Sequence, residues 1–416
     1  MNLRLKDEPI IQSLSDIDFY KFTMGHLIFW KHGIIWTRFR FTNRTKSVIL
    51  TKHIPIQQLR EQLDHVRTLR FNNSELHYLR GTNEYQERMF KEEYLQFLKN
   101  LQLPEYELRY EGEDIILEFP GDWQRNTYWE TIALAIINEL YYRNLMAKKS
   151  RFEQDAIFAT GVTRLEQKIK RLREFPELTF SDFGTRRRFS REWQEYVVSA
   201  LAAELPNQLK GTSNTKLAMD LGLMPTGTSA HEMDMAYSGI YHDSDETIRT
   251  SHRRFLQDWR EMYGRGLAVA LSDTYGSEFF FSDLTKEEAE FDKGTRQDSG
   301  DPFEYGDKTI GFYQKNDISA PQKMVVFSNG LDVEEMIRLH VYFRGRILDT
   351  YGWGTNETND LGMAPLSLVV KLSESNGHGV VKLSDNLNKA TGKPEDVERF
   401  KRIFGYTNTK SEICTY

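Results

Sequence analysis

The stretch Leu267-Ala-Val-Ala-Leu-Ser-Asp-Thr-Tyr-Gly276 places a short apolar run directly before a small polar segment that ends in glycine. An apolar run bounded by such a turn signal is typical of a buried strand. Helical patterns separate further stretches of the same kind, which are 178–186, 208–214, 291–301, 324–330 and 347–356, with one more strand at 366–370. Strands that alternate with helices predict an α/β fold with a parallel sheet.

The polar segments share one position, immediately after a predicted strand. In α/β barrels the loops after the strands gather at one end and build the active site. Glycine, serine, threonine, asparagine and aspartate also mark ordinary turns, which is the alternative for each segment taken alone. Because the segments recur in phase with the strands, we interpret them as parts of one site.

The first part of the chain has a different pattern. Residues 36–42, 106–110 and 114–119 read as strands, and 130–146 and 151–173 have the periodicity of long helices. We therefore divide the chain into an N-terminal α/β domain up to residue 150, open to completion by C-terminal segments, and an α/β barrel domain over 151–416.

Composition excludes several classes of protein. The chain has 416 residues, 39% of them hydrophobic, and a net charge of −6, which argue against global disorder and against a general nucleic-acid binder. No apolar run is long enough for a membrane span, and the N-terminus has no signal-peptide pattern, so we expect a cytoplasmic protein without a membrane partner. The only cysteine, Cys414, excludes an internal disulfide framework and a cysteine-based zinc site.

The segment Pro225-Thr-Gly-Thr-Ser-Ala-His-Glu232 ends in a histidine beside a carboxylate. An imidazole that is held in one tautomer is a good nucleophile or proton acceptor, which makes His231 a candidate catalytic residue. Glu232 or Asp273 could orient the ring. The alternative is a helix start with a capping hydroxyl and a surface histidine.

Local cations must meet any anionic substrate of this acidic chain. Arg186, Arg187, Arg188 and Arg191 form such a cluster beside Phe183. Guanidinium groups bind phosphate or carboxylate bidentately, and an aromatic ring can stack on a flat heterocycle. In an extended segment Arg186 and Arg188 would share one face. The alternative is a solvated basic surface.

Three more segments are candidates for phosphate binding. Gly294 to Asp301 combines Arg296 with Asp298 in a predicted turn, where carboxylates and hydroxyls suit a magnesium-bound diphosphate or a ribose; a turn followed by a helix cap is the alternative. Ser328-Asn329-Gly330 and Tyr351 to Asn359 resemble backbone phosphate cradles. Neither matches a Walker A pattern.

Taken together, these segments resemble the nicotinate phosphoribosyltransferases, which are type II phosphoribosyltransferases. The resemblance rests on segments that follow in order over nearly the whole chain: 15–24, 183–188, 211–214, 225–232, 272–275, 296–301 and 352–356. It implies an irregular, incomplete α/β barrel with an N-terminal α/β domain. It also implies an ATP-dependent enzyme of ligase type in NAD salvage, which joins nicotinate to phosphoribosyl diphosphate through a phosphorylated histidine.

The resemblance also implies residue roles. His231 would be the phosphohistidine, with Asp273, Arg296 and Asp298 as further catalytic residues. The substrate-binding residues would be Tyr20, Phe183, Thr185, Arg186, Ser213, Ser328, Asn329, Gly330, Gly352, Gly354, Thr355 and Asn356. ATP and Mg²⁺ would be the cofactors, with no metal ligands assigned.

Phe183 and Tyr20 would hold the pyridine ring, and in this family the tyrosine can come from the neighbouring subunit of a homodimer. The related nicotinamide enzyme has aspartate at the position of Ser213, so a neutral hydroxyl there favours the acid as substrate. Nicotinamide or quinolinate as substrate, or a non-catalytic nucleotide sensor, remain the alternatives. Lys21, Asn214 and the region 382–393 have no assigned role.

Overall fold

The computed structural model describes residues 5–84 and 86–411, so Cys414 and the first four residues lie outside the described part of the chain. The strands are β1 (Trp36–Asn43), β2 (Asn83–Glu84), β3 (Glu87–Arg88), β4 (Glu107–Glu111), β5 (Asp114–Asp122), β6 (Phe180–Asp182), β7 (Leu209–Thr212), β8 (Val269–Leu271), β9 (Gly294–Gln297), β10 (Met324–Phe327), β11 (Leu348–Trp353), β12 (Leu368–Ser375) and β13 (His378–Gly379).

The helices are α1 (Tyr20–Lys31), α2 (Ile56–Thr68), α3 (Asn73–Gly81), α4 (Glu92–Lys99), α5 (Trp123–Asn126), α6 (Trp129–Met146), α7 (Arg151–Leu172), α8 (Arg191–Glu204), α9 (Thr215–Leu221), α10 (His231–Ile240), α11 (Asp245–Tyr263), α12 (Ser277–Asp283), α13 (Lys286–Phe291), α14 (Pro302–Lys315), α15 (Val333–Phe343), α16 (Thr355–Thr358) and α17 (Pro394–Ile403). No helix among the described residues is both long and apolar enough to cross a membrane.

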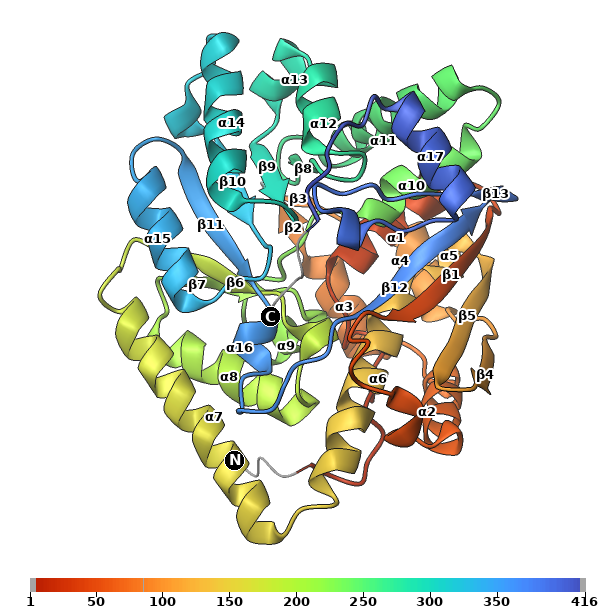
Figure 1. Ribbon diagram of the computed structural model, residues 1–416, viewed down its shortest axis with the longest axis vertical. Helices are drawn as coiled ribbons and strands as arrows, with labels where there is room; N and C mark the ends of the chain where they lie inside the picture. Colours follow the sequence, from red (N-terminus) through yellow and green to blue (C-terminus); the bar gives the residue numbers. More distant parts are fainter. Residues whose placement is uncertain (1–4, 85, 412–416) are drawn as a thin grey trace.

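A parallel sheet of six strands, in the order β7-β6-β11-β10-β9-β8, carries the second half of the chain. Helices α12 to α15 lie on its outer side (Figure 1). Among the described residues no strand pairing joins β7 to β8, so the sheet stays open. The predicted α/β architecture is confirmed, and the open edges agree with an incomplete barrel.

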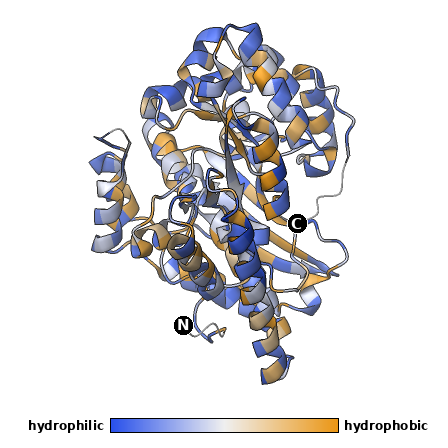
Figure 2. Cartoon of the chain, turned by 90° about the vertical axis from the view of Figure 1, so that its left-hand side faces the viewer, coloured by the Kyte–Doolittle hydropathy of each residue, from blue (hydrophilic) through white to orange (hydrophobic). Residues whose placement is uncertain are grey.

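The second sheet is antiparallel, in the order β13-β12-β1-β5-β4. Strand β12 pairs with β1 from Asn43↔Leu368 to Thr37↔Ser375, so a C-terminal segment of the chain lies beside the central strand of the N-terminal sheet. Figure 2 shows hydrophobic residues gathered on the central strands and hydrophilic residues along the outer helices. The strand predicted at 366–370 exists, but it lies in this sheet and not in the parallel one.

Parts of two segments that the sequence predicts as loops belong to strands in the structure. Residues 294–297 form β9, and 351–353 complete β11. A side chain at Gly294 would collide with the Met324 carbonyl, so glycine here permits close pairing of β9 with β10. The glycines in these segments therefore serve strand packing as well as the polar loops that follow.

Candidate functional site

The register of the parallel sheet brings the strand ends to one edge. Leu271 of β8 pairs with Arg296 of β9, and Phe327 of β10 pairs with Gln297 and with Tyr351 of β11. The loops after β6, β9, β10 and β11 therefore meet, as the alternation in the sequence predicts. With segments from α1, α6, α10 and β12, they line a cavity of about 140 Å³.

Most of the predicted site residues line this cavity. They are Tyr20, Phe183, Arg186, His231, Arg296, Asp298, Ser328, Asn329, Gly330, Gly352, Gly354, Thr355 and Asn356. Arg296 also donates to the backbone carbonyl of Ser229 at 3.2 Å, which ties the loop before His231 to the end of β9. Most of the segments singled out in the sequence thus line one cavity.

His231 is the first residue of α10 and is 2% exposed. Its Nδ1 lies 2.9 Å from the Thr274 hydroxyl, and its Nε2 lies 2.8 Å from Lys382 Nζ and 3.1 Å from an oxygen of Asp298. Burial and the Lys382 ammonium lower the pKa of His231, which favours the neutral imidazole. His231 thus begins a helix, but no side chain caps that helix and the histidine is not on the surface, so only part of the alternative reading applies.

Three groups surround Nε2 of His231. Lys382 Nζ lies 3.5 Å from Asp273 and 3.6 Å from Asp298. Burial alone would raise the pKa of Asp298, but the contacts with His231, Lys382 and Arg296 hold that pKa well below its usual range. Asp298 is therefore a carboxylate.

His231, Asp273 and Asp298 bring one possible ligand atom each to within 4.8 Å of one another. Mg²⁺ prefers octahedral sets of oxygen ligands and waters. Here one donor is an imidazole nitrogen, and the Lys382 ammonium already supplies the positive charge at the centre. This set does not fit a resident Mg²⁺ ion.

The three consecutive arginines have different surroundings. They lie in and after a 3-10 turn over Thr185–Arg187, so the extended geometry considered for the sequence does not apply. Arg186 and Arg187 line the cavity, whereas Arg188 is fully buried in a bidentate ion pair with Asp16 at 2.7 and 2.9 Å. Arg188 therefore holds the fold together.

Glu130, the second residue of α6, lines the cavity beside Tyr20. Its carboxylate meets Lys21 at 2.7 Å, Lys371 at 3.1 Å and the Tyr20 hydroxyl at 3.3 Å. Burial opposes the charge, but Lys21 and Lys371 hold the pKa of Glu130 far below its usual range. Lys21, which had no role in the sequence, also pairs with Glu232 at 2.5 Å and so links α1 to α10.

Four predictions need correction. Thr185 is buried and accepts a hydrogen bond from Gln194, and Ser213 donates to Asp18 at 2.6 Å; neither lines the cavity. Ser213 acts on the site only through Asp18, whose other oxygen lies 3.1 Å from Arg186. Glu232 faces Lys21 and Trp123, so it does not orient His231.

The fourth correction concerns Asp273. Asp273 is fully buried behind the cavity, and its nearer oxygen lies 3.7 Å from Nε2, too far for a direct hydrogen bond to the ring. Tyr20 lines the cavity of its own chain, and a site shared between subunits stays a prediction.

Comparisons with known proteins agree with this geometry. The model of the nicotinate phosphoribosyltransferase (NAPRTase) family matches residues 178–408, and the model of the N-terminal domain of that family matches residues 16–138. The chain belongs to the nicotinate phosphoribosyltransferase family.

Two crystal structures of nicotinate phosphoribosyltransferases are similar over almost the full chain. The enzyme from Vibrio cholerae is 31% identical with a TM-score of 0.86, and the match covers 99% of this chain and 97% of that one. The enzyme from Porphyromonas gingivalis is 30% identical with a TM-score of 0.84, and the match covers 95% and 100%.

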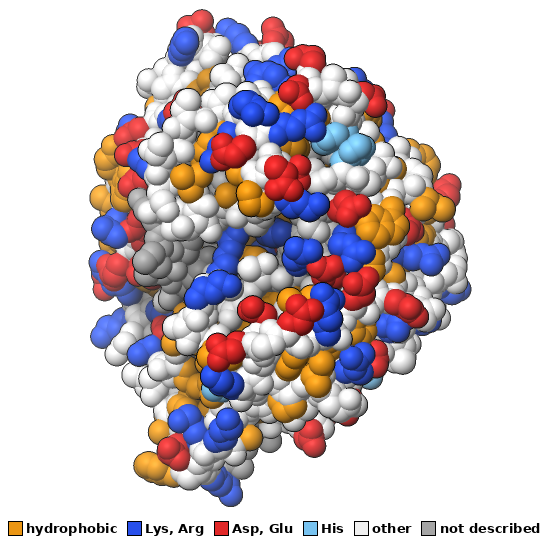
Figure 3. All heavy atoms as spheres, turned by 45° about the vertical axis from the view of Figure 1, so that its right-hand side comes forward, with side chains coloured by type: hydrophobic (Ala, Val, Ile, Leu, Met, Phe, Trp, Pro, Cys, Tyr) orange, Lys and Arg blue, Asp and Glu red, His pale blue; other side chains and the backbone are white. Residues whose placement is uncertain are grey.

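The cavity of this family member is strongly cationic. Seven basic side chains line it against two carboxylates, Glu130 and Asp298. The basic residues are Arg44, Arg186, Arg187, Arg296, Lys371, Lys382 and Lys389. Figure 3 shows a hollow near the middle of one face with Lys and Arg side chains in and around it.

Sequence reasoning missed several of these residues. Lys389 binds the Asn329 side chain at 2.6 Å and the Asp298 carbonyl at 2.7 Å, so the unassigned region 382–393 closes the site. Lys371 lies within an otherwise apolar strand segment and Glu130 within a long apolar helix. A charged residue in such surroundings is the signal that could have found both.

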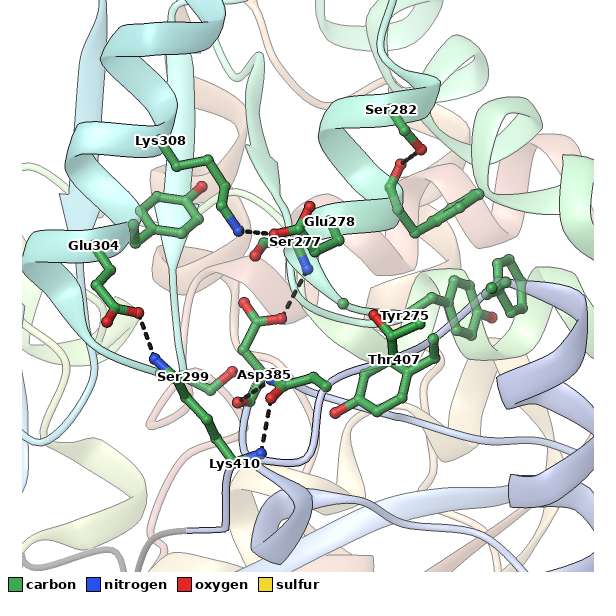
Figure 4. A pocket seen from close by; sticks show the side chains of 18 of the residues that line it. Tyr275, Ser277, Glu278, Ser282, Ser299, Glu304, Lys308, Asp385, Thr407 and Lys410 are labelled. Carbon is green, nitrogen blue, oxygen red and sulfur yellow. Dashed lines mark hydrogen bonds and ion pairs between the residues drawn. The ribbon is translucent and has the colours of Figure 1, made fainter.

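A second cavity of about 620 Å³ lies behind the loop that carries Asp298. Figure 4 shows Asp385 pointing into it between two ion pairs, Lys308–Glu278 and Lys410–Glu304. The Ser299 hydroxyl donates to Asp273 and accepts from the Asp385 backbone N–H at 2.9 Å. One serine thus separates this cavity from the cluster around His231.

Proposed function

We propose that this protein transfers a phosphoribosyl group from phosphoribosyl diphosphate to nicotinate, coupled to ATP hydrolysis through phosphorylation of His231. The observation that carries the proposal is a single cavity in which a neutral, buried histidine lies among seven cations. Such a charge excess in a chain of net charge −6 favours substrates with several anionic groups. The product, nicotinate mononucleotide, would enter NAD salvage in the cytoplasm.

The transfer step needs no protein nucleophile. The bond from the anomeric carbon to the diphosphate oxygen breaks, the electron pair leaves with diphosphate, and the pyridine nitrogen forms the new bond. The protein holds the reactants in line and stabilises the departing charge. Arg296, Lys382 and Lys389 are the cations that line the cavity beside Asp298 and Asn329, where the diphosphate would lie.

The ends of the substrates have separate partners. Phe183 and Tyr20 would hold the pyridine ring, and stacking of this kind contributes on the order of 1 kcal/mol per contact. Ser328 to Gly330 and Gly352 to Asn356 would bind the 5′-phosphate through backbone N–H groups. Mg²⁺ would enter with the substrate, as the counter-ion of the diphosphate.

ATP would phosphorylate His231 from the side of the imidazole ring that faces the cavity. The Nε2 lone pair attacks the γ-phosphorus, and the bond to the leaving oxygen of ADP breaks. The new negative charge beside Lys382 and Arg296 would reorganise the loop that precedes His231 and tighten substrate binding. A homodimer with a shared active site is also expected from the family.

The test measures product formation with nicotinate, nicotinamide and quinolinate side by side, with and without ATP. We expect ATP-stimulated turnover with nicotinate alone. His231→Ala should lose the ATP stimulation and keep a slow ATP-independent transfer. Full ATP coupling in that variant would refute the assignment of His231, and turnover only with quinolinate would refute the substrate.

A further inference from the structure

The two ring nitrogens of His231 face different surroundings. Nε2 faces the cavity, where Lys382 and Asp298 lie within 3.1 Å of it. Nδ1 faces the closed interior and contacts the Thr274 hydroxyl at 2.9 Å. Thr274 is 2% exposed, so this contact is shielded from bulk solvent.

The single proton of the Thr274 hydroxyl is already used in another hydrogen bond. That hydroxyl donates to one oxygen of Asp234 at 2.8 Å. The other oxygen of Asp234 accepts from His252 Nδ1, also at 2.8 Å, and Asp234 is 1% exposed. Because a hydroxyl has one proton and a carboxylate only accepts, Thr274 must accept from His231, which places a proton on Nδ1.

We propose that Thr274 and Asp234 are positioning residues that keep the proton on Nδ1 and thereby leave Nε2 as the atom that takes the phosphoryl group. The proposal rests on the proposed function for the identity of the reaction. Neither residue touches the substrate; both act through the imidazole.

The phosphoryl transfer balances with this arrangement. The Nε2 lone pair forms the N–P bond while the P–O bond to ADP breaks and its electron pair leaves with ADP. The Nδ1 proton stays in place, so the phosphorylated ring is a cation. Asp234 offsets that charge through Thr274, as the buried aspartate of a hydrolase triad does for its histidine.

The opposite tautomer, which carries its proton on Nε2, does not agree with the hydrogen bonds of the closed interior around Nδ1. It would require the Thr274 hydroxyl to turn toward Nδ1, which leaves a buried oxygen of Asp234 without a donor. It would let Nε2 donate to Asp298 at 3.1 Å, but it would direct the same N–H toward the Lys382 ammonium, which lies closer to Nε2, at 2.8 Å, and has only protons to offer. Asp273 gives no alternative inner partner, because it lies on the Nε2 side of the ring.

The sequence separation explains how the fold builds this chain of contacts. Asp234 follows His231 by three residues on α10, so both lie on one side of the helix. Thr274 follows β8 directly, and His252 projects from α11. Packing of α10 against α11 and the strand end places all four groups together.

The test is ¹⁵N NMR of the protein labelled on its ten histidines, with His231→Gln to assign the signals of residue 231. We expect Nδ1 of His231 to be protonated in the wild type. An unprotonated Nδ1 there would overturn the proposal without recourse to any variant.

Two matched variants give the second arm. Thr274→Val, which removes the hydroxyl at nearly constant shape, should mix the tautomers and slow formation of the phosphoenzyme from ATP at least tenfold. Thr274→Ser, which keeps the hydroxyl, should restore the single tautomer and the rate of phosphoenzyme formation. A folded Thr274→Val with the wild-type tautomer and the wild-type rate would overturn the proposal. Absence of any phosphoenzyme in the wild type would instead refute the proposed function, while the nitrogen signals would still decide the tautomer.

Discussion

At the scale of single residues, Asp385 is a carboxyl whose charge the fold disfavours. Burial and repulsion from Asp273 raise its pKa to about 6, although the Ser277 N–H donates to it at 2.8 Å. The folded state therefore binds the proton more tightly than the unfolded chain does. Stability falls as the pH rises from about 4 to about 6, and at neutral pH the cost is fully present, about 3 kcal/mol at most.

Asp385→Asn keeps an acceptor for the Ser277 N–H and removes the charge. We expect the free energy of unfolding at pH 7.5 to rise by about 1 to 3 kcal/mol, with little change at pH 4, where the wild-type carboxyl is protonated. Urea denaturation at the two pH values measures both. An equal gain at pH 4 would show that the charge of Asp385 is not the cause.

The arginines 186 to 188 show how far single residues are predictable. Their chemistry identifies them as anion-binding candidates, and Arg186 does line the cavity. The 3-10 turn that sends Arg188 inward to Asp16 depends on a partner more than 170 residues away, which no local pattern encodes. The same holds for His231, whose residue type is informative but whose partners, Thr274 and Lys382, come from distant segments.

At the scale of elements, the end of β11 supports the ring that is expected to stack on nicotinate. A side chain at Gly352 would collide with the Phe183 ring. In Gly352→Ala the ring must shift, so we expect the KM for nicotinate to rise about fivefold to tenfold, the equivalent of one lost stacking contact. Steady-state kinetics with nicotinate varied at saturating phosphoribosyl diphosphate measures the effect.

Gly311→Ala is the matched control, because a side chain at Gly311 on α14 would meet no atom within 4 Å. It should leave the kinetics unchanged. A normal KM in Gly352→Ala would mean that the position of Phe183 does not govern nicotinate binding.

Elements were more predictable than their exact limits. Periodicity alone predicts strands at 36–42, 106–110 and 114–119 and the long helices α6 and α7, and the structure has these strands at 36–43, 107–111 and 114–122. Strand β9 was missed because Gly294 and its polar neighbours read as a turn, while close pairing with β10 extends them. Tertiary packing thus overrode the local turn signal.

At the scale of the whole molecule, the two sheets are interlocked through the chain. Strand β12 follows the last strand of the parallel sheet, yet it lies between β1 and β13 in the antiparallel one. It also carries Lys371 into the cavity, so the same segment completes the sheet and the site. Hydropathy identifies a strand near residue 368, but not that its partner lies more than 320 residues earlier.

This topology predicts that the first 150 residues do not form an independent folding unit. Without β12, strand β1 loses one whole row of ladder hydrogen bonds and becomes an open, hydrophobic edge. We expect residues 1–150 alone to show no cooperative urea transition by circular dichroism. When the chain is split between α6 and α7 and both pieces are co-expressed, they should purify as one complex with a single transition. Cooperative unfolding of the isolated first piece would show that β12 is dispensable, because β1, β5 and β4 would then suffice for a stable sheet.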